Sequence, residues 1–272
     1  MTRKARVVLV QADLTWEDPT ANLKNLDAML SDITLQPSDV VVLPEMFPTG
    51  FSMNAETIAT SRDGPVVEWM RRVAASRKVH VLGSHAENEN GRIFNTAVVV
   101  APDGTVQGAY RKIHLFQDEQ NNYSSGDKLL LVPLCGVTAA VFICYDLRFP
   151  ELFRAASTHG AQLFFVVASW PAVRQGHWDL LLHARAIENQ AFVCGCNRTG
   201  RDPNQTYAGG SVVVGPGGNT IRRLDMSPQT AVVELDFEEV STLRKNFDCL
   251  SDRRPLIYEK LSSPRLSRKE QN

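Results

Sequence analysis

Three side chains that could do chemistry follow stretches that are predicted to be strands. Glu45 comes after "VVVLP", Lys112 comes after "VQGAYR" and Cys144 comes after "VTAAVFI". Side chains placed where strands stop are held by a rigid scaffold and still face a cleft, so α/β proteins often build sites there. A carboxylate, an ammonium and a thiol together could supply a base, a stabiliser of negative charge and a nucleophile.

The thiol needs help to act as a nucleophile, because an ordinary cysteine has a pKa of about 8.5 and is mostly protonated at neutral pH. Glu45 could take the proton of Cys144, whereas Lys112 could favour the thiolate and then stabilise the oxyanion of a tetrahedral intermediate. A helix predicted to begin near Pro150 could contribute through its N-terminal end. Considered alone, Cys144 is more simply a packed cysteine, Glu45 a turn residue exposed to solvent and Lys112 a surface charge. Only the combination of the three favours catalysis.

The apolar pattern predicts strands and helices that alternate along most of the chain. Helices are predicted from the Gly64-Pro65 pair to about residue 78 and at 20–33, 150–159, 178–189 and 238–247. Strands are predicted at 6–11, 40–43, 79–84, 94–100, 106–111, 129–132, 137–144, 163–168, 192–197, 211–214 and 231–235. Because hairpin-like strand pairs occur beside β-α alternation, we predict an α/β layered sandwich with mixed sheets.

Composition limits the class of protein and its compartment. The 272 residues carry 29 basic and 30 acidic side chains, which argues against a nucleic-acid partner. No apolar run approaches the roughly 20 residues that span a bilayer, and the first residues are too polar for a secretory signal. Five cysteines at irregular spacing favour a reducing compartment. We therefore expect a cytoplasmic protein without membrane partners, with a single domain over 1–260 and a polar tail over 261–272.

The short sequence "CGC" raises the question of a metal site. Cys194 and Cys196 lack the two-residue spacing of zinc knuckles, and only His183 lies near them in sequence. Two cysteines that alternate along a strand are more simply buried small residues. We expect no metal site there.

Three motifs, in this order and at this spacing, resemble the signatures of the carbon–nitrogen hydrolases of the nitrilase superfamily. They are "LPEMF", "YRKIHLF" and "CYDLRFPE", supported by "ASWP", "HARAIENQAFV", "GGSVVVGPGG" and "RRPLIYE". The resemblance runs from Val7 to Glu259. It implies a four-layer α-β-β-α sandwich that is usually dimeric or larger, and we expect a homodimer here.

The resemblance also implies roles for single residues. Glu45 would be the general base, Lys112 would stabilise the tetrahedral intermediate and Cys144 would be the nucleophile. Glu119 matches a second glutamate that is common in the family, with Asp118 as its only close competitor. No metal or organic cofactor is implied.

Within the family, "LPEMFPTGFSM", "HLFQDEQ" and "ASWP" are most similar to the ω-amidase branch. Such enzymes hydrolyse the terminal carboxamide of short 2-oxo-dicarboxylic acid monoamides such as 2-oxoglutaramate and 2-oxosuccinamate. The far carboxylate of such a small-molecule substrate needs a cation, and Arg148 is predicted, since guanidinium can bind a carboxylate bidentately. An ion pair with Asp146 or Glu151 would explain Arg148 equally well.

Two further predictions complete the expected site. The resemblance implies that the backbone N–H of Tyr145 would share the oxyanion with Lys112. Three aromatic residues would form apolar walls that exclude water, although aromatic residues are also common in plain cores: Phe47, Phe116 and Trp170.

The sequence is also compatible with other interpretations. A Cys–His hydrolase would use His114, which shares a face with Lys112 if the strand continues that far. A nitrilase, a carbamoylase or an amidase for larger amides would use the same three motifs. A catalytically silent interaction module on the same fold is also possible, although no position of the catalytic type is substituted.

Overall fold

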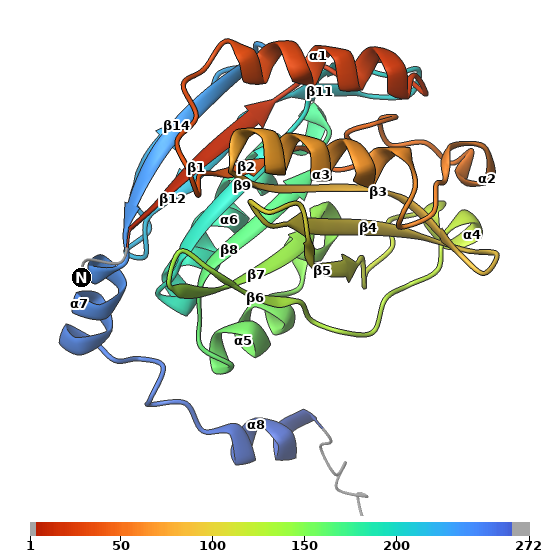
Figure 1. The fold of residues 1–272 in the computed structure, drawn as a ribbon. Coiled ribbons are helices and arrows are strands. Elements are labelled where there is room, and N and C mark those ends of the chain that lie inside the picture. The colour runs from red at the N-terminus through yellow and green to blue at the C-terminus, as the bar shows by residue number, and fades with distance from the viewer. Residues whose placement is uncertain (1–3, 263–272) are drawn as a thin grey trace, which may run out of the picture.

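Two six-stranded sheets pack face to face in this computed structural model, which describes residues 4–262 (Figure 1). In the first sheet, β1, β2 and β3 pair in parallel and every other pairing is antiparallel. Its strands, in spatial order, are β14 (Gln229–Asp236), β1 (Lys4–Gln11), β2 (Val40–Val42), β3 (His80–Glu89), β4 (Arg92–Val100) and β5 (Val106–Arg111).

The second sheet repeats this plan, with three parallel strands flanked by antiparallel ones. The parallel strands are β7, β8 and β9. In spatial order the sheet contains β13 (Thr220–Arg223), β12 (Val212–Val214), β9 (Phe192–Asn197), β8 (Ala161–Ala168), β7 (Val137–Ile143) and β6 (Leu131–Leu134). A separate hairpin is formed by β10 (Thr199–Arg201) and β11 (Thr206–Ala208).

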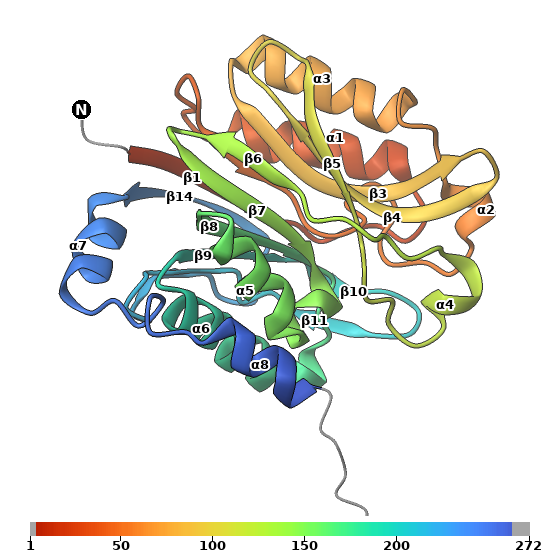
Figure 2. The same ribbon diagram turned by 90° about the horizontal axis from the view of Figure 1, so that it is seen from below.

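Helices cover the outer face of each sheet (Figure 2). The first sheet carries α1 (Pro19–Ser31) and α3 (Pro65–Arg77), and the second carries α5 (Pro150–Thr158) and α6 (Gln175–Asn189). The other helical segments are α2 (Ala55–Ile58), α4 (Glu119–Asn122), α7 (Glu238–Asn246), α8 (Pro255–Ser262) and the 3₁₀ turns η1 (Cys144–Arg148) and η2 (Ala172–Arg174).

The alternation of side chains along β1 explains the layers. Val7 and Leu9 lie in the core between the two sheets, whereas Val8 and Val10 lie in the core beneath α1 and α3. A strand sends successive side chains to opposite faces, so a strand that is apolar throughout must be covered on both sides. The predicted four-layer α-β-β-α sandwich with mixed sheets is confirmed.

The "CGC" cysteines lie inside this packing. Cys194 and Cys196 are buried in β9, and the Cys196 thiol is 3.4 Å from the carbonyl oxygen of Val10 and 3.2 Å from that of Val42. Both carbonyls belong to the opposite sheet, so this thiol bridges the two sheets. Within residues 4–262, no group of three or more His, Cys, Asp or Glu side chains could hold a metal ion.

Several element boundaries differ from the prediction. The strand predicted over 137–144 ends at Ile143, because Cys144 already turns away from it. The pattern missed the short hairpin β10–β11 and the helix α8, which continues past the predicted domain boundary at residue 260. The rest of the predicted polar tail, from residue 263, lies outside the described residues. None of the helices within 4–262 is long and apolar enough to cross a membrane.

Candidate active site

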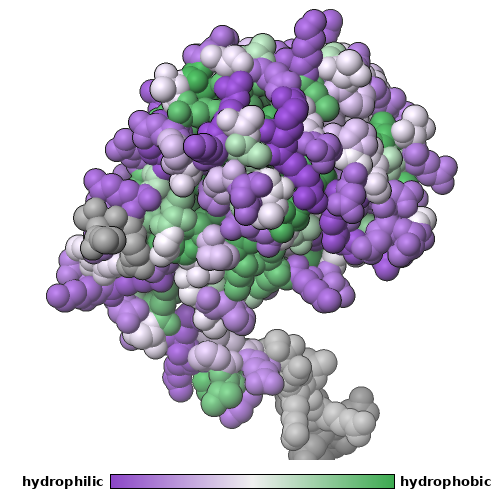
Figure 3. Space-filling model, viewed as in Figure 1, coloured by the Kyte–Doolittle hydropathy of each residue, from purple (hydrophilic) through white to green (hydrophobic). Residues whose placement is uncertain are grey.

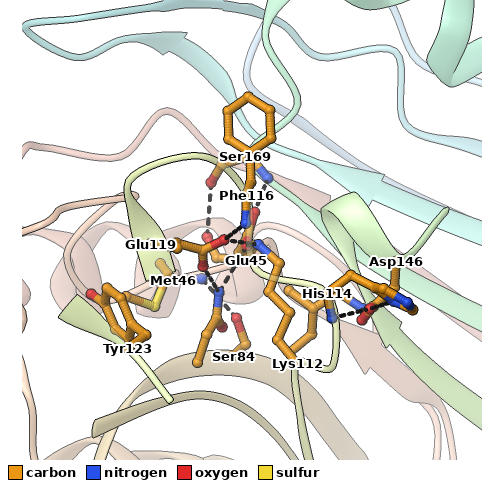
Figure 4. Close-up of polar contacts among 12 residues, drawn as sticks. Glu45, Met46, Ser84, Lys112, His114, Phe116, Glu119, Tyr123, Asp146 and Ser169 are labelled. Carbon is orange, nitrogen blue, oxygen red and sulfur yellow. Dashed lines mark hydrogen bonds and ion pairs between the residues drawn. The ribbon is translucent and has the colours of Figure 1, made fainter. Parts of the chain in front are cut away.

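Four buried polar side chains meet beyond the ends of β2 and β5 (Figure 4). The Lys112 Nζ lies 2.9 Å from Glu45 Oε1 and 2.7 Å from Glu119 Oε2. Asn95 Nδ2 donates to the same two carboxylates, at 2.8 Å to Glu45 Oε1 and 3.3 Å to Glu119 Oε1. All four side chains are fully buried, so their charges interact more strongly than they would in water.

Glu45 is oriented by Ser169 and by the turn at Met46. Its Oε2 accepts the Ser169 N–H, just after β8, at 2.8 Å, and the Ser169 hydroxyl donates to the Glu45 carbonyl at 3.1 Å. The next residue, Met46, has a φ of +50°, and its N–H donates to Ser84 Oγ at 2.9 Å. Because each carboxylate oxygen has a fixed donor, the carboxylate cannot turn freely.

Lys112 remains an ammonium in this setting. Burial alone would lower the pKa of Lys112, but the charges of Glu119 and Glu45 outweigh it and raise that pKa above its ordinary value. Burial raises the pKa of Glu119, with the charge of Lys112 opposing it. Glu119 opens α4 and also accepts the Phe116 N–H at 2.7 Å, which fixes its position beside the lysine.

Cys144 lies at a sharp break directly after β7. Its φ of +45° is in the left-handed region, which is strained for a residue other than glycine. The buried Asp146 holds this break in place, because it accepts the Tyr110 hydroxyl at 2.8 Å and the His114 N–H at 3.0 Å. Tyr110 and His114 flank Lys112, so Asp146 ties the cysteine turn to the segment that carries the lysine.

The thiol is neutral in the resting site. Burial and then the negative charge of Glu45 raise the pKa of Cys144 well above its ordinary value. Lys112 opposes this rise, as expected from its charge, but does not cancel it. The site therefore holds a thiol beside a carboxylate that can accept its proton.

Cys144 opens into a cavity of about 410 Å³, a size typical of small-molecule sites. Glu45, Lys112 and Cys144 all contribute to its wall. The other lining residues are Trp16, Phe51, Ser52, Met53, Asn54, Phe116, Gln117, Asp118, Tyr145, Arg148, Ser169, Trp170, Pro171, Arg174, Asp202, Asn204, Gln205 and Tyr207.

Residues 6–245 match the sequence model of the carbon–nitrogen hydrolases. The chain belongs to the carbon–nitrogen hydrolase family. An omega-amidase, YafV, of Escherichia coli (strain K12) is 40% identical over 252 residues, which are 91% of this chain and 96% of that protein. A 2-oxoglutaramate amidase of Bacillus subtilis (strain 168) is 34% identical over 259 residues, 94% of this chain and 100% of that protein.

A solved structure gives the same assignment. The CN-hydrolase superfamily protein XC1258 from Xanthomonas campestris, described with an arsenic adduct in its active site, has a TM-score of 0.88 and 35% identity. The match covers 92% of this chain and 97% of that one. The predicted enzyme class, an amidase of the nitrilase superfamily, is therefore confirmed.

In this carbon–nitrogen hydrolase the predicted catalytic residues lie together. Glu45, Lys112 and Glu119 form one ion-paired cluster, and Cys144 lies on the wall of the same cavity. The predicted oxyanion residue, Tyr145, also lines this cavity. Asp118, the competitor of Glu119, is exposed at the cavity and is outside the cluster.

The predicted apolar walls are partly wrong. Phe116 and Trp170 do line the cavity, but Phe47 does not. Phe47 is fully buried in the core beneath α3, where its ring centroid lies 5.7 Å from that of Trp69. The positive φ of Met46 sends the chain back toward β3, and Phe51 takes a place on the wall instead.

Arg148 lies on the cavity wall without a carboxylate partner. Its guanidinium carbon is 4.9 Å from the Trp170 ring centroid, and Nη2 is 3.2 Å from His177 Nδ1. Within residues 4–262 no ion pair joins it to Asp146 or Glu151. The purely structural explanation of Arg148 as an ion-pair partner is therefore not supported.

His114 has a different environment from the one a Cys–His hydrolase needs. Its Nδ1 lies 3.0 Å from Asp146 Oδ1, and its ring stacks on Phe149 with centroids 3.5 Å apart. The ring turns toward Asp146 and away from the glutamates (Figure 4), and His114 is absent from the cavity wall.

Sequence reasoning missed two polar residues of the site. Asn95 is the one amide in the apolar run "IFNTAVVV", and an amide in a buried strand was a usable signal. Arg174 lies on the cavity wall beside Trp170, whose Nε1 donates to the Arg174 carbonyl at 2.8 Å. Its place in sequence carried no such signal, because an arginine before a helix is usually a surface residue.

Proposed function

We propose that this enzyme is an ω-amidase, which hydrolyses the terminal amide of small 2-oxo-dicarboxylic acid monoamides. The observation that carries the proposal is Arg148: a guanidinium without a carboxylate partner on the wall of the cavity that also holds Cys144, Glu45 and Lys112. A substrate with an amide at one end and a carboxylate at the other matches this arrangement. The similarity to the omega-amidase and the 2-oxoglutaramate amidase supports the same substrate class.

In the first half of the proposed reaction, Cys144 Sγ attacks the amide carbon while Glu45 takes the thiol proton. The coupled transfer suits a site in which the thiol is neutral at rest. The oxyanion that forms is stabilised by the Lys112 ammonium and by the backbone N–H of Tyr145. The carbon–nitrogen bond then breaks, and ammonia leaves with the proton returned by Glu45, which leaves a thioester on Cys144.

In the second half, water enters and Glu45 takes its proton as the oxygen attacks the thioester carbon. The carbon–sulfur bond breaks, the acid is released and Glu45 returns the proton to the Cys144 sulfur. Glu119 does not reach the cavity wall in this scheme, and it acts by holding Lys112 in place and charged. The steps balance without a further reactant.

Ammonia release from a panel of compounds tests the proposal. The panel contains 2-oxoglutaramate, 2-oxosuccinamate, glutamine, asparagine, carbamoyl-β-alanine and butyronitrile. We expect the two 2-oxo amides to have the highest kcat/KM, and we expect Cys144→Ala and Glu45→Gln to abolish turnover. Because His114 is held away from the cavity, His114→Asn should keep part of the activity.

Each other outcome contradicts a definite part of the proposal. Preference for the nitrile or the carbamoyl compound would replace the ω-amidase with another activity of the family while leaving the roles of Glu45, Lys112 and Cys144 intact. Full loss of activity in His114→Asn, with the variant still folded, would favour a Cys–His mechanism. Stoichiometric alkylation of Cys144 without turnover of any amide would indicate a catalytically silent protein.

A further inference from the structure

A second guanidinium lies on the same cavity wall as Arg148. Arg174 ends η2, and its guanidinium carbon is 5.2 Å from the ring centroid of Phe116. Within residues 4–262 no ion pair joins Arg174 to a carboxylate, so two arginines of the cavity wall lack such a partner. One guanidinium is enough to bind a single carboxylate bidentately, so the second requires its own explanation.

The N-terminal end of the helix α6 follows Arg174 directly in the chain, although none of the α6 residues lines the cavity. This helix of 15 residues has no side-chain cap and no acidic residue in its first turn. The uncapped N–H groups of a helix carry partial positive charge at its N-terminal end. Trp170 connects the two arginines, because its ring lies beneath Arg148 and its Nε1 donates to the Arg174 carbonyl.

Within residues 4–262, neither Asp118 nor Asp202, which also line the cavity, forms an ion pair with Arg148 or Arg174. Asp202 is already engaged, because its Oδ1 accepts the N–H of Asn204 at 2.8 Å and that of Gln205 at 2.7 Å, and its Oδ2 accepts the Tyr207 hydroxyl. Asp118 is exposed to solvent, which screens its charge. At the catalytic end of the cavity the Glu45 carboxylate faces the thiol, and the Lys112 ammonium is paired with Glu45 and Glu119.

We propose that Arg174 is a specificity residue that distinguishes a 2-oxo group from a 2-ammonium group on the substrate. The inference rests on the proposed function. Arg148 binds the substrate carboxylate, and Arg174 faces the adjacent carbon, where an oxo oxygen accepts a hydrogen bond and an ammonium is repelled. The enzyme thereby accepts 2-oxo amides and rejects glutamine and asparagine, which have the same length and the same terminal amide.

The test compares kcat/KM for 2-oxosuccinamate and asparagine, which differ only at this carbon. In Arg174→Gln the ratio of the two values should fall about tenfold or more, the usual effect of losing a charged hydrogen-bond partner. Arg174→Lys keeps the positive charge and should retain most of the ratio. Its kcat/KM for the 2-oxo amide should fall, because an ammonium lacks the planar set of N–H donors of a guanidinium. Arg222→Gln, on the exposed strand β13, is the matched control and should behave like the wild type.

Arg174→Met is the second neutral variant, because it keeps an aliphatic stem against Phe116 if the glutamine variant does not fold. An unchanged ratio in folded Arg174→Gln or Arg174→Met would overturn the assignment of Arg174 while the wild type still hydrolyses the 2-oxo amide. A wild type that does not hydrolyse 2-oxosuccinamate or 2-oxoglutaramate would overturn the proposed function itself. The two failures are therefore distinguishable.

Discussion

At the scale of single residues, the two buried glutamates of the site share the same hydrogen-bond donors. One ammonium, that of Lys112, lies between two buried carboxylates, and one amide NH₂, that of Asn95, donates to both of them. Two like charges in a buried space repel each other strongly unless donors are placed between them. Asn95 is therefore a positioning residue that keeps Glu45 and Glu119 close to the same lysine without touching the cavity.

Asn95→Ala should lower kcat about 10- to 100-fold with little change in KM, because the lost N–H donors orient Glu45 but do not contact the substrate. Thr96→Ala is a matched control from the same strand, since it removes an equally buried hydrogen bond to Glu87 on the other face. Steady-state kinetics would measure kcat and KM of both variants, and thermal unfolding would measure how far each substitution destabilises the protein. Equal loss of kcat in the two variants would show a general effect of a damaged strand.

The neutral resting thiol makes a pH prediction. Since burial and Glu45 raise the pKa of Cys144, the fraction of thiolate should still be increasing above pH 9. The rate of alkylation of Cys144 by iodoacetamide, followed by mass spectrometry of the peptide, should therefore keep rising with pH beyond that point. A rate that is flat from pH 6 to pH 9 would mean a preformed thiolate ion paired with Lys112.

At the scale of elements, the site is assembled from chain segments just after strands of both sheets. Glu45 follows β2, Lys112 follows β5 and Cys144 follows β7, while the backbone after β8 reaches Glu45 through Ser169. A strand ending in a turn of positive φ at Met46 or Cys144 exposes one side chain while the rest of the strand stays packed. The rigid sheets thus fix the positions of short, strained turns.

The strand β3 carries a buried histidine, His85, that should make the free energy of unfolding decrease at acidic pH. Burial lowers the pKa of His85 to about 4, with the charge of Glu87 opposing, so His85 is neutral in the folded protein. In the unfolded chain His85 binds a proton near its ordinary pKa of 6.5, whereas in the folded protein it binds one only near pH 4. The stabilisation of the folded protein is therefore complete above pH 6.5 and is lost as the pH falls toward 4. The loss amounts to about 3 kcal/mol.

In His85→Gln the free energy of unfolding should therefore fall by less between pH 7 and pH 4.5 than in the wild type. Urea unfolding at the two pH values measures the difference. The activity of His85→Gln at pH 7 shows whether this variant keeps an intact active site. His159→Gln, a change at an exposed residue, should keep the acid dependence of the wild type. An identical acid dependence in His85→Gln would contradict the prediction.

At the scale of the whole molecule, apolar residues gather on the helical side of the second sheet. Val173, Leu180 and Ile187 recur every seven residues through η2 and α6 and are 79%, 73% and 54% exposed. The helix α8 projects from the body of the protein and carries exposed apolar surface of its own (Figure 3), including Leu256 and Leu261. A contiguous group of exposed apolar side chains is typical of a contact with another protein.

The expected homodimer stays a prediction, and these residues provide its test. If two copies pack through the exposed side chains of Val173, Leu180 and Ile187, Leu180→Glu should yield monomers at concentrations where the wild type sediments as a dimer. Met226→Glu places the same charge at an exposed apolar residue outside η2, α6 and α8, and it should remain dimeric. A wild type that sediments as a monomer at these concentrations would refute the prediction.

A layered sandwich with mixed sheets could be predicted from local patterns in the sequence, whereas the four layers and the catalytic roles were implied by the family resemblance of its motifs. Val7 to Val10 are apolar at every position, and a strand that must be covered on both faces implies layers on both sides. Glu45, Lys112 and Cys144 each follow a predicted strand, and their motifs carried a family resemblance that the comparisons confirm.

Only the tertiary structure decided what each remaining side chain touches. Phe47 lies two residues from Glu45 yet packs in the core, Asn95 reaches two carboxylates from another strand, and Arg174 shares a cavity with Arg148 from a turn 26 positions later. The protonation of Cys144 depends in the same way on burial and on a carboxylate about 100 positions away. Strand and helix periods are set by neighbours in sequence, whereas these contacts are set by the way separate loops meet where the two sheets pack together.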